Sequence, residues 1–190
     1  FQNPDTKDVY IGIPVDIFIY ITLLTNRISS GDAGILLHGT HIMISQNTIT
    51  DTQRGITDAF NTLPWTNRHL TIQLNHLKYN KVGIYLHGSR DYSITQNEIT
   101  NSTVVGIYLA EDVYTSIHPE NITIKENIIS NSAQGIVSEN SINMTIEENH
   151  IQHNTLGLSF LYDAYTSVKK NTFQDNNKTV IYQWAFFPFS

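Results

Sequence analysis

Aliphatic and polar residues alternate in short segments that recur along the chain. In each segment, the residues three before and two after a recurring asparagine are apolar, and the residue four before it is Thr, Ser or Met. The seven asparagines are Asn26, Asn47, Asn75, Asn97, Asn127, Asn149 and Asn171. Alternation with a period of two indicates a β-strand with one buried face. The pattern therefore predicts one short strand before each asparagine.

A glycine followed by an aliphatic residue marks a second predicted strand in each repeat. These glycines are Gly12, Gly34, Gly55, Gly83, Gly106, Gly135 and Gly157. We expect them where φ is positive or where the backbone is crowded. Successive asparagines are 21, 28, 22, 30, 22 and 22 residues apart, too close for a helix in every repeat. This spacing suits one turn of a β-solenoid, with strands stacked in parallel about 4.8 Å apart.

Stacking of the turns predicts what the repeated side chains do. The aliphatic positions become ladders that fill a narrow core, and the asparagine amides bond one another along the axis inside a tight bend. On the outer face, Lys125, Glu147 and Lys169 follow one another in consecutive turns. They are expected to form modest surface ion pairs.

Repeats of the form G-I-x-L…I-x-x-N-x-I resemble those of the pectate-lyase-like superfamily, especially its NosD-like members and its carbohydrate-binding and sugar-hydrolase repeat proteins. The resemblance covers roughly residues 12 to 176. It implies an all-β, right-handed single-stranded parallel β-helix of about seven to eight turns of roughly 22 residues. We expect one domain over residues 1–190, part of a longer precursor or larger protein, with 177–190 as a C-terminal cap or plug. Activity does not follow, because the superfamily holds lyases, hydrolases, epimerases and structural modules.

The composition and charge of the chain limit the kinds of partner it can bind. With 17 acidic against 11 basic residues, a net charge of −6 and no run of like charges, the chain has no footprint for nucleic acid. There is no cysteine, so disulfides and thiolate metal sites are excluded. No apolar run reaches the length of a membrane span. An extracellular, cell-surface or periplasmic location and a glycan partner are expected.

Two insertions interrupt the repeat at the same predicted corner. The glycine-to-asparagine distance is 13 or 14 residues in five turns, but 20 after Gly55 and 21 after Gly106. The insertions cover about 58–67 and 111–120, and the turn of Gly83 lies between them. Aromatic and imidazole side chains there suit sugar rings and hydroxyls. The residues expected to bind substrate are Phe60, Trp65, Tyr114, His118 and His38.

A reaction is harder to specify than a binding surface. The residues that could take part in catalysis are Asp58, Glu111, Asp112, His87 and Arg90. Two carboxylates at a suitable separation could serve a hydrolase, and an arginine beside a carboxylate-bound cation could serve a lyase. An epimerase is the third enzyme class, but no complete signature of any of the three is present. Whether the protein is an enzyme stays open.

Metal sites receive little support from the sequence. His38 and His87 are predicted two turns apart, about 10 Å, too far for one ion. No stacked cluster of Asp residues indicates calcium, so no cofactor is expected and calcium is left open. The NosD-like resemblance implies a copper-related accessory role, for which the available soft-metal ligands are His38, His41, His87 and His118.

The leading hypothesis is thus an exported or cell-surface β-helix that binds, and in one version processes, a polysaccharide at the corner with the two insertions. The alternative is a structural repeat module of a surface layer, fibre or multidomain protein. The apolar segments near both ends, VYIGIPVDIFIYI and VIYQWAFFPFS, support end-to-end self-association or contact with an adjacent domain.

Overall fold

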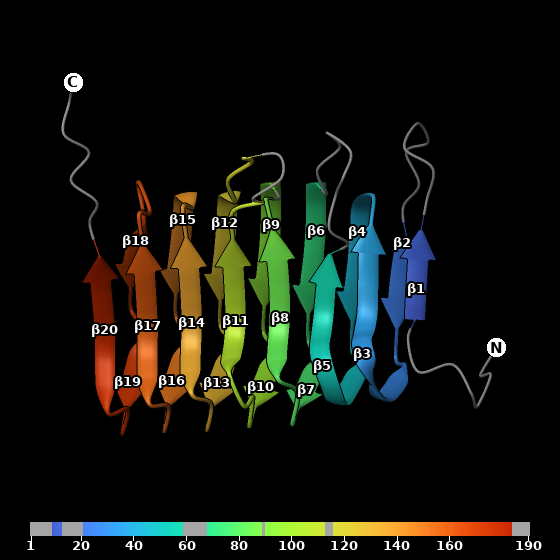
Figure 1. Cartoon of the computed structure of the whole chain (residues 1–190), viewed down its shortest axis with the longest axis horizontal. Helices are drawn as coiled ribbons and strands as arrows, with labels where there is room; N and C mark the ends of the chain where they lie inside the picture. Colours follow the sequence, from blue (N-terminus) through green and yellow to red (C-terminus); the bar gives the residue numbers. More distant parts are fainter. Residues whose placement is uncertain (1–8, 13–20, 59–67, 89, 113–115, 184–190) are drawn as a thin grey trace.

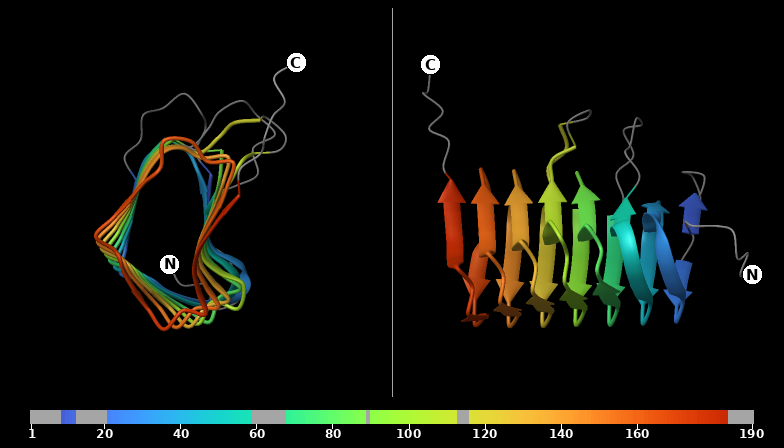
Figure 2. Two further views of the ribbon diagram at one scale, coloured as in Figure 1. Left: turned by 90° about the vertical axis from the view of Figure 1, so that its left-hand side faces the viewer. Right: turned by 60° about the horizontal axis from the view of Figure 1, so that its bottom comes forward.

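The chain forms a solenoid of parallel strands, seen from the side in Figure 1. A computed structural model describes residues 9–12, 21–58, 68–88, 90–112 and 116–183. Viewed along the axis, successive turns superpose around an elongated interior (Figure 2). Among these residues there is no helix long and apolar enough to cross a membrane. The parallel β-helix expected from the repeat is confirmed.

One wall of the solenoid is a seven-stranded sheet that takes one strand from each turn. Its order is β18-β15-β12-β9-β6-β4-β2, and all neighbours are parallel. The strands are β2 (Ile21–Leu24), β4 (Thr40–Ser45), β6 (Arg68–Gln73), β9 (Arg90–Thr95), β12 (Glu120–Lys125), β15 (Ile142–Glu147) and β18 (Ser167–Lys169).

The remaining walls belong to a 13-stranded sheet. Its longer strands are β1 (Val9–Gly12), β8 (Val82–His87), β11 (Val105–Ala110), β14 (Gln134–Glu139), β17 (Leu156–Leu161) and β20 (Lys178–Gln183). Its three-residue strands are β7 (His76–Lys78), β10 (Glu98–Thr100), β13 (Ile128–Ser130), β16 (His150–Gln152) and β19 (Thr172–Gln174). In two turns a short and a long strand are continuous, as β3 (Arg27–His38) and β5 (Thr48–Asp58). Residues 178–183 thus continue the sheet beside β17.

The aliphatic positions stack as predicted and fill the interior. Ile72, Ile94 and Ile124, each three residues before a repeat asparagine, are partners in the strand registers of β6, β9 and β12. All three are fully buried. Because the central members of such a row are shielded from water, apolar burial stabilises the contacts between neighbouring turns there.

The asparagine ladder is confirmed in atomic detail. Asn97 lies in the bend between β9 and β10, where its Oδ1 accepts hydrogen bonds from the backbone N–H and the Nδ2 of Asn75, both at 3.0 Å. Its own Nδ2 donates to the carbonyls of Ile72 and Thr95 at 2.9 and 3.1 Å and to Asn127 Oδ1 at 3.0 Å. Amide-to-amide bonds of this kind link all seven repeat asparagines.

The bend itself depends on the residue before each asparagine. Those residues have left-handed φ values between 55° and 58°, although none of them is glycine. A left-handed non-glycine residue costs about 1–2 kcal/mol. The buried amide bonds of the ladder offset that cost, so the same backbone bend recurs in every turn.

A second ladder lies at the next bend, five residues after each repeat asparagine from Asn47 onward. Its members are Thr52, Asn80, Ser102, Ser132, Asn154 and Asn176. Asn80 Oδ1 accepts the backbone N–H and the hydroxyl of Thr52 at 3.0 and 2.7 Å. Asn154 Oδ1 accepts the backbone N–H of Ser132 at 2.9 Å. The sequence reading missed this row because its residue type changes from turn to turn.

The repeat glycines are required by crowding. A Cβ added to Gly106 would lie 2.7 Å from both the Gly135 carbonyl oxygen and Ile129 Cγ2. Gly106 does not have a left-handed φ, so of the two reasons predicted for the repeat glycines, crowding is correct here and positive φ is wrong. The glycine and the isoleucine of the next turn therefore form one packing unit.

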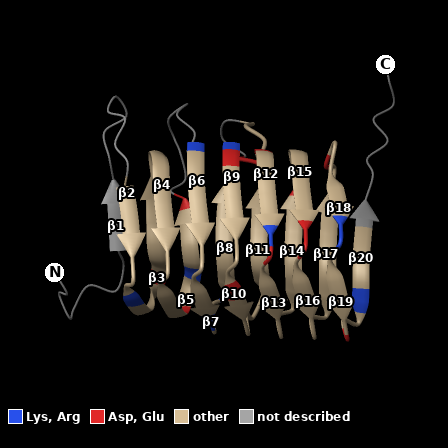
Figure 3. Ribbon diagram, turned by 180° about the vertical axis from the view of Figure 1, so that it is seen from behind, with Lys and Arg blue, Asp and Glu red and all other residues tan. Residues whose placement is uncertain are grey.

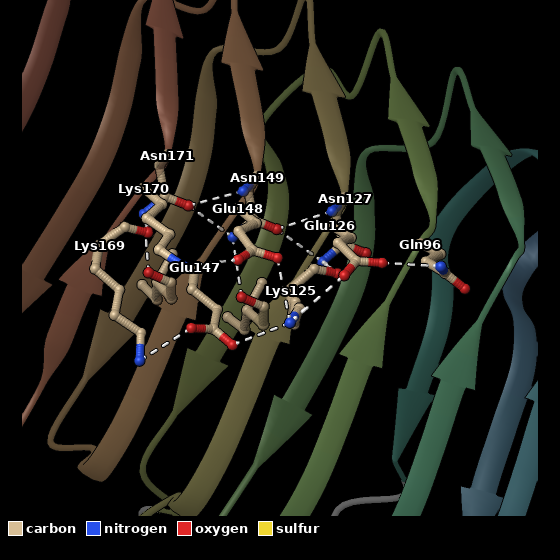
Figure 4. Close-up of polar contacts among 12 residues, drawn as sticks. Gln96, Lys125, Glu126, Asn127, Glu147, Glu148, Asn149, Lys169, Lys170 and Asn171 are labelled. Atoms are coloured by element: carbon tan, nitrogen blue, oxygen red, sulfur yellow. Dashed lines mark hydrogen bonds and ion pairs between the residues drawn. The ribbon is translucent and has the colours of Figure 1, made fainter.

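The predicted surface ion pairs are present and extend to neighbouring residues (Figure 4). Lys125 Nζ lies 3.3 Å from Glu147 Oε1 and 3.2 Å from Glu148 Oε2, and Lys169 Nζ lies 3.0 Å from Glu147 Oε2. The hydrogen bond from Lys169 is the main reason that the pKa of Glu147 is lowered. These groups are solvent-exposed, so the network contributes modestly to stability and weakens with salt.

Candidate functional site

The strand order brings the ends of β5, β8, β11 and β14 side by side at the predicted corner. Here the structure pairs Asp58 with His87, the last residues of β5 and β8. The carboxylate accepts the backbone N–H of His87 at 3.0 Å and lies 2.8 Å from His87 Nδ1. Asp58 is 1% exposed and His87 is 7% exposed. The pair therefore joins two neighbouring turns inside the wall.

Glu111 and His118 also lie close together in the second insertion. Glu111 Oε2 accepts a hydrogen bond from Asn140 Nδ2 at 2.8 Å, and Glu111 Oε1 lies 3.9 Å from His118 Nδ1. Both side chains are partly exposed. They form the more accessible polar part of the corner.

Asp112 has a structural position at this corner. It is buried, and its backbone pairs with Ile117 to close the loop. Gly88 packs under this loop with a φ of 44°, and a Cβ there would lie 2.7 Å from both Asp112 Cβ and the Ile117 carbonyl oxygen. Glycine at position 88 therefore allows the second insertion to fold down onto the neighbouring turn.

Two more of the predicted site residues, Arg90 and His38, lie in the described part of the chain. Arg90 begins β9 and forms an ion pair with Glu120 of the neighbouring strand β12. Arg90 Nε lies 3.2 Å from Glu120 Oε2. His38 ends β3 directly after Leu37, the register partner of Asp58, so it lies beside the Asp58 end of β5. Phe60, Trp65 and Tyr114 lie outside the described residues, so their assignment to a binding surface stays a prediction.

A groove that the sequence reading missed lies on the outer face of the 13-stranded sheet. It has a volume of about 720 Å³ and is lined by residues of β3, β5, β8, β11, β14 and β17. Asp32 and Arg54 lie within β3 and β5, Lys81 directly precedes β8, and Glu139 ends β14. Both polar and apolar side chains, among them Gln134 and Val105, line the remainder. The groove thus runs along the solenoid axis across six neighbouring strands.

Two stacked tyrosines form the middle of the groove. Tyr85 and Tyr108 are register partners on β8 and β11, with ring centroids 5.0 Å apart and planes inclined by 16°. Both are the second residue after a repeat glycine, which was an available sequence signal. The Tyr85 ring also contacts the His87 ring edge-on at 4.0 Å between centroids. Through His87, the groove is therefore continuous with the Asp58 corner.

Both tyrosines remain neutral phenols. Burial, assisted by the Asp58 carboxylate, raises the pKa of Tyr85. Burial and a hydrogen bond to Glu139 raise the pKa of Tyr108. A neutral phenol can donate to and accept from hydroxyl groups, and its ring can cover apolar C–H faces. The two tyrosines therefore suit ring stacking and hydrogen bonding with a ligand, and neither would act as a phenolate base.

The Asp58–His87 pair has the connectivity of a carboxylate-oriented imidazole, as general bases often do. Both side chains are nevertheless buried in the wall, so the groove presents Tyr85 at this point. The described geometry accordingly supports a binding surface more directly than a catalytic one.

A family comparison agrees with this solenoid. Residues 22–185 match the model of the family described as periplasmic copper-binding protein (NosD). The chain belongs to the NosD family. No curated protein matches the sequence of this NosD-family chain significantly.

Solved structures share the fold at low sequence identity. The mannuronan C-5 epimerase AlgE4 A-module of Azotobacter vinelandii is 12% identical, with a TM-score of 0.59, covering 85% of this chain and 56% of the epimerase. A double mutant of the periplasmic alginate epimerase AlgG is 16% identical, with a TM-score of 0.57, covering 86% of this chain and 44% of that one. The NosD-family chain thus spans about half the length of these structures, and the likeness establishes the fold alone.

The family description names copper, so the side chains of this chain can be compared with the ligands that copper prefers. The part of the chain that the structure describes contains no group of three His, Asp or Glu that could hold a metal ion. Of the four histidines predicted as soft-metal ligands, His87 pairs with Asp58 and His118 lies beside Glu111. His41 instead shares a pocket with His69 and Met43. Two imidazoles and a thioether are donors that suit copper, so this set fits.

Proposed function

We propose that the protein is an exported β-helix module that binds a polysaccharide along the groove on its 13-stranded sheet. The observation that carries the proposal is the stacked pair Tyr85 and Tyr108 in the middle of a groove that crosses six strands. A linear polymer lying along the axis would meet a new turn about every 5 Å. The repeating units of the polymer and the repeating turns of the solenoid would therefore run along the same axis.

The chemistry of the groove supports a sugar ligand. Neutral tyrosines offer ring surface and hydroxyl groups, which complement sugar C–H faces and sugar hydroxyls. Arg54 and Lys81 supply cationic donors near the Asp32 carboxylate, and Glu139 supplies a second carboxylate. A few polar groups among apolar side chains fix the orientation of a ligand. The named activities of the two epimerases make alginate a sensible first polysaccharide to test.

The loops at the corner would extend the same surface. Tyr85 connects the groove to His87 and Asp58, where the first insertion begins. Within the proposal, Phe60, Trp65, Tyr114 and His118 contact the polymer at this end. Whether Asp58, His87, Glu111, Asp112 or Arg90 then act on the bound sugar is a separate question, and the proposal is limited to binding.

The test is binding of the full chain to a panel of soluble polysaccharides by affinity electrophoresis and titration calorimetry. Tyr108→Ala should weaken binding roughly tenfold, the scale of one aromatic contact, and Tyr85→Ala should do the same. Tyr165→Ala is the matched control because Tyr165 is 85% exposed and does not line the groove. Trp65→Ala and Tyr114→Ala test the corner separately.

Several results would contradict the proposal. Absence of binding to every polysaccharide, with the variants folded by circular dichroism, would favour a structural repeat module. Binding that survives both groove substitutions but is lost on Trp65→Ala or Tyr114→Ala would move the site to the corner.

Copper handling is a second candidate function, favoured by the pocket that His41, Met43 and His69 share. A bound copper ion would be held there as a cargo or a structural ion, and no redox step is assigned to it. Copper uptake by the purified chain, measured by metal analysis after loading and desalting, tests this function. A chain that retains no copper would exclude it.

A further inference from the structure

A small pocket lies on the outer face of the seven-stranded sheet, whereas the tyrosine groove lies on the 13-stranded sheet. It has a volume of about 290 Å³ and is formed over β2, β4 and β6. His41, Met43 and His69 line it together with Thr22 and Thr71. Strands β2 and β4 carry no charged residue, as seen in the rear view of Figure 3. Soft and neutral donors therefore dominate this part of the surface.

The two imidazoles are brought together by the strand register. Thr40 pairs with Arg68 and Ile42 pairs with Leu70, which sets His41 level with His69 on adjacent strands. Their ring centroids are 4.7 Å apart. Each histidine lies six residues before a repeat asparagine, so the pairing follows from the same periodicity that stacks the core.

Each imidazole has an oxygen close to its Nδ1 atom. His41 Nδ1 lies 3.2 Å from Thr40 Oγ1, and His69 Nδ1 lies 3.9 Å from Asp91 Oδ2. A histidine that binds a metal through one ring nitrogen commonly has its other nitrogen oriented by such an outer oxygen. Thr40 and Asp91 are thus the oxygen-bearing neighbours of the two rings on their Nδ1 side.

A methionine supplies the third donor. The chain has two methionines, and their surroundings differ completely. Met144 is fully buried in the core, whereas Met43 is 38% exposed and faces the pocket. Met43 is the register partner of Thr22 and Thr71, the two hydroxyl residues beside it. A polarizable thioether at this exposed position selects a soft ion.

We propose that His41, Met43 and His69 form a Cu(I) site, with Thr40 and Asp91 as the outer groups that orient the two imidazoles. Two neutral nitrogens and one thioether sulfur suit Cu(I) better than Zn(II), since soft ligands favour the monovalent ion and no anionic donor completes the set. The assignment rests on the second candidate function, copper handling, and is independent of polysaccharide binding.

The experiment loads the full chain with Cu(I) under anaerobic conditions and measures affinity by competition with a chromophoric chelator. The wild-type chain should bind one Cu(I), with both nitrogen and sulfur neighbours in X-ray absorption spectra. Met43→Leu and His69→Ala should each weaken binding by tenfold or more. Asp91→Asn should weaken it by about 10-fold to 100-fold if Asp91 orients His69.

Controls keep the test specific. Met144→Leu removes the other thioether, and His153→Ala removes an exposed histidine that does not line the pocket. Neither should change Cu(I) affinity. Circular dichroism establishes that each variant folds, and Met43→Leu should fold because the side chain is only partly buried.

The outcomes separate the site from the function. Cu(I) binding with wild-type affinity in the Met43→Leu/His69→Ala double variant overturns the site while copper handling stands. A wild-type chain that binds no Cu(I) overturns both. A spectrum without a sulfur neighbour removes Met43 from the site.

Discussion

Replacing Asn97 by Leu tests the amide ladder at its centre. The substitution removes the acceptor of the buried Asn75 backbone N–H and a donor to the Ile72 carbonyl. It also removes both side-chain links of the ladder, to Asn75 and to Asn127. The core above and below keeps its apolar rows, so the change acts mainly on buried hydrogen bonds.

The magnitude follows from the groups that lose partners. A buried donor or acceptor left without a partner costs about 1–3 kcal/mol. For the Asn75 N–H and the Ile72 carbonyl together, the expected loss is about 2–6 kcal/mol. That is a large share of the 5–15 kcal/mol, roughly, that stabilises an ordinary domain. The chain should therefore unfold at a clearly lower urea concentration.

Urea unfolding followed by far-UV circular dichroism measures this change. Asn177→Leu is the matched control, because Asn177 is exposed and outside both ladders. It should alter the unfolding free energy by less than about 0.5 kcal/mol. Equal unfolding midpoints for the two variants would refute the reasoning that the ladder amides hold the turns together.

Three further substitutions test other features of the solenoid. Gly106→Ala should cost about 1–3 kcal/mol of unfolding free energy because its Cβ would collide with Ile129 and backbone; wild-type stability in urea would contradict the crowding. Burial raises the pKa of Asp163 from 3.8 to about 6, so native protein binds the extra proton and stability falls as pH rises through roughly 4 to 6. Asp163→Asn should therefore gain at most about 3 kcal/mol at pH 8 and nothing below pH 4, and a pH-independent difference would refute this. Lys125→Ala should cause a small loss in urea that disappears in about 1 M salt, whereas a salt-resistant loss would show that Lys125 acts by packing rather than by pairing with Glu147.

Much of the fold could be predicted because it repeats. A row that uses one residue type, such as the asparagines around Asn97, is visible in the sequence and fixes strands, bends and register together. The alternating charges of Lys125, Glu147 and Lys169 could be read in the same way. Once the spacing is known, residues at equal offsets must lie about 5 Å apart.

The second ladder was not predictable in that way. Asn80, Ser132 and Asn154 share a position and a hydrogen-bonding role, but a hydroxyl and an amide look unrelated in sequence. Their equivalence appears only when the backbone presents each oxygen to the N–H of the turn before. The crowding at Gly106 likewise depends on atoms of the next turn.

For the candidate sites, the sequence located residues and the tertiary structure decided their surroundings. The repeat spacing placed Asp58 and His87 at one corner. Their burial in the wall of the solenoid depends on the tertiary structure. Two pairings could be predicted from offsets in the repeat. Tyr85 and Tyr108 each lie two residues after a repeat glycine, and His41 and His69 each lie six residues before a repeat asparagine. The physical reason for the division is simple: periodicity fixes which residues are neighbours, whereas exposure, side-chain direction and hydrogen-bond partners depend on the packing of all the turns around them.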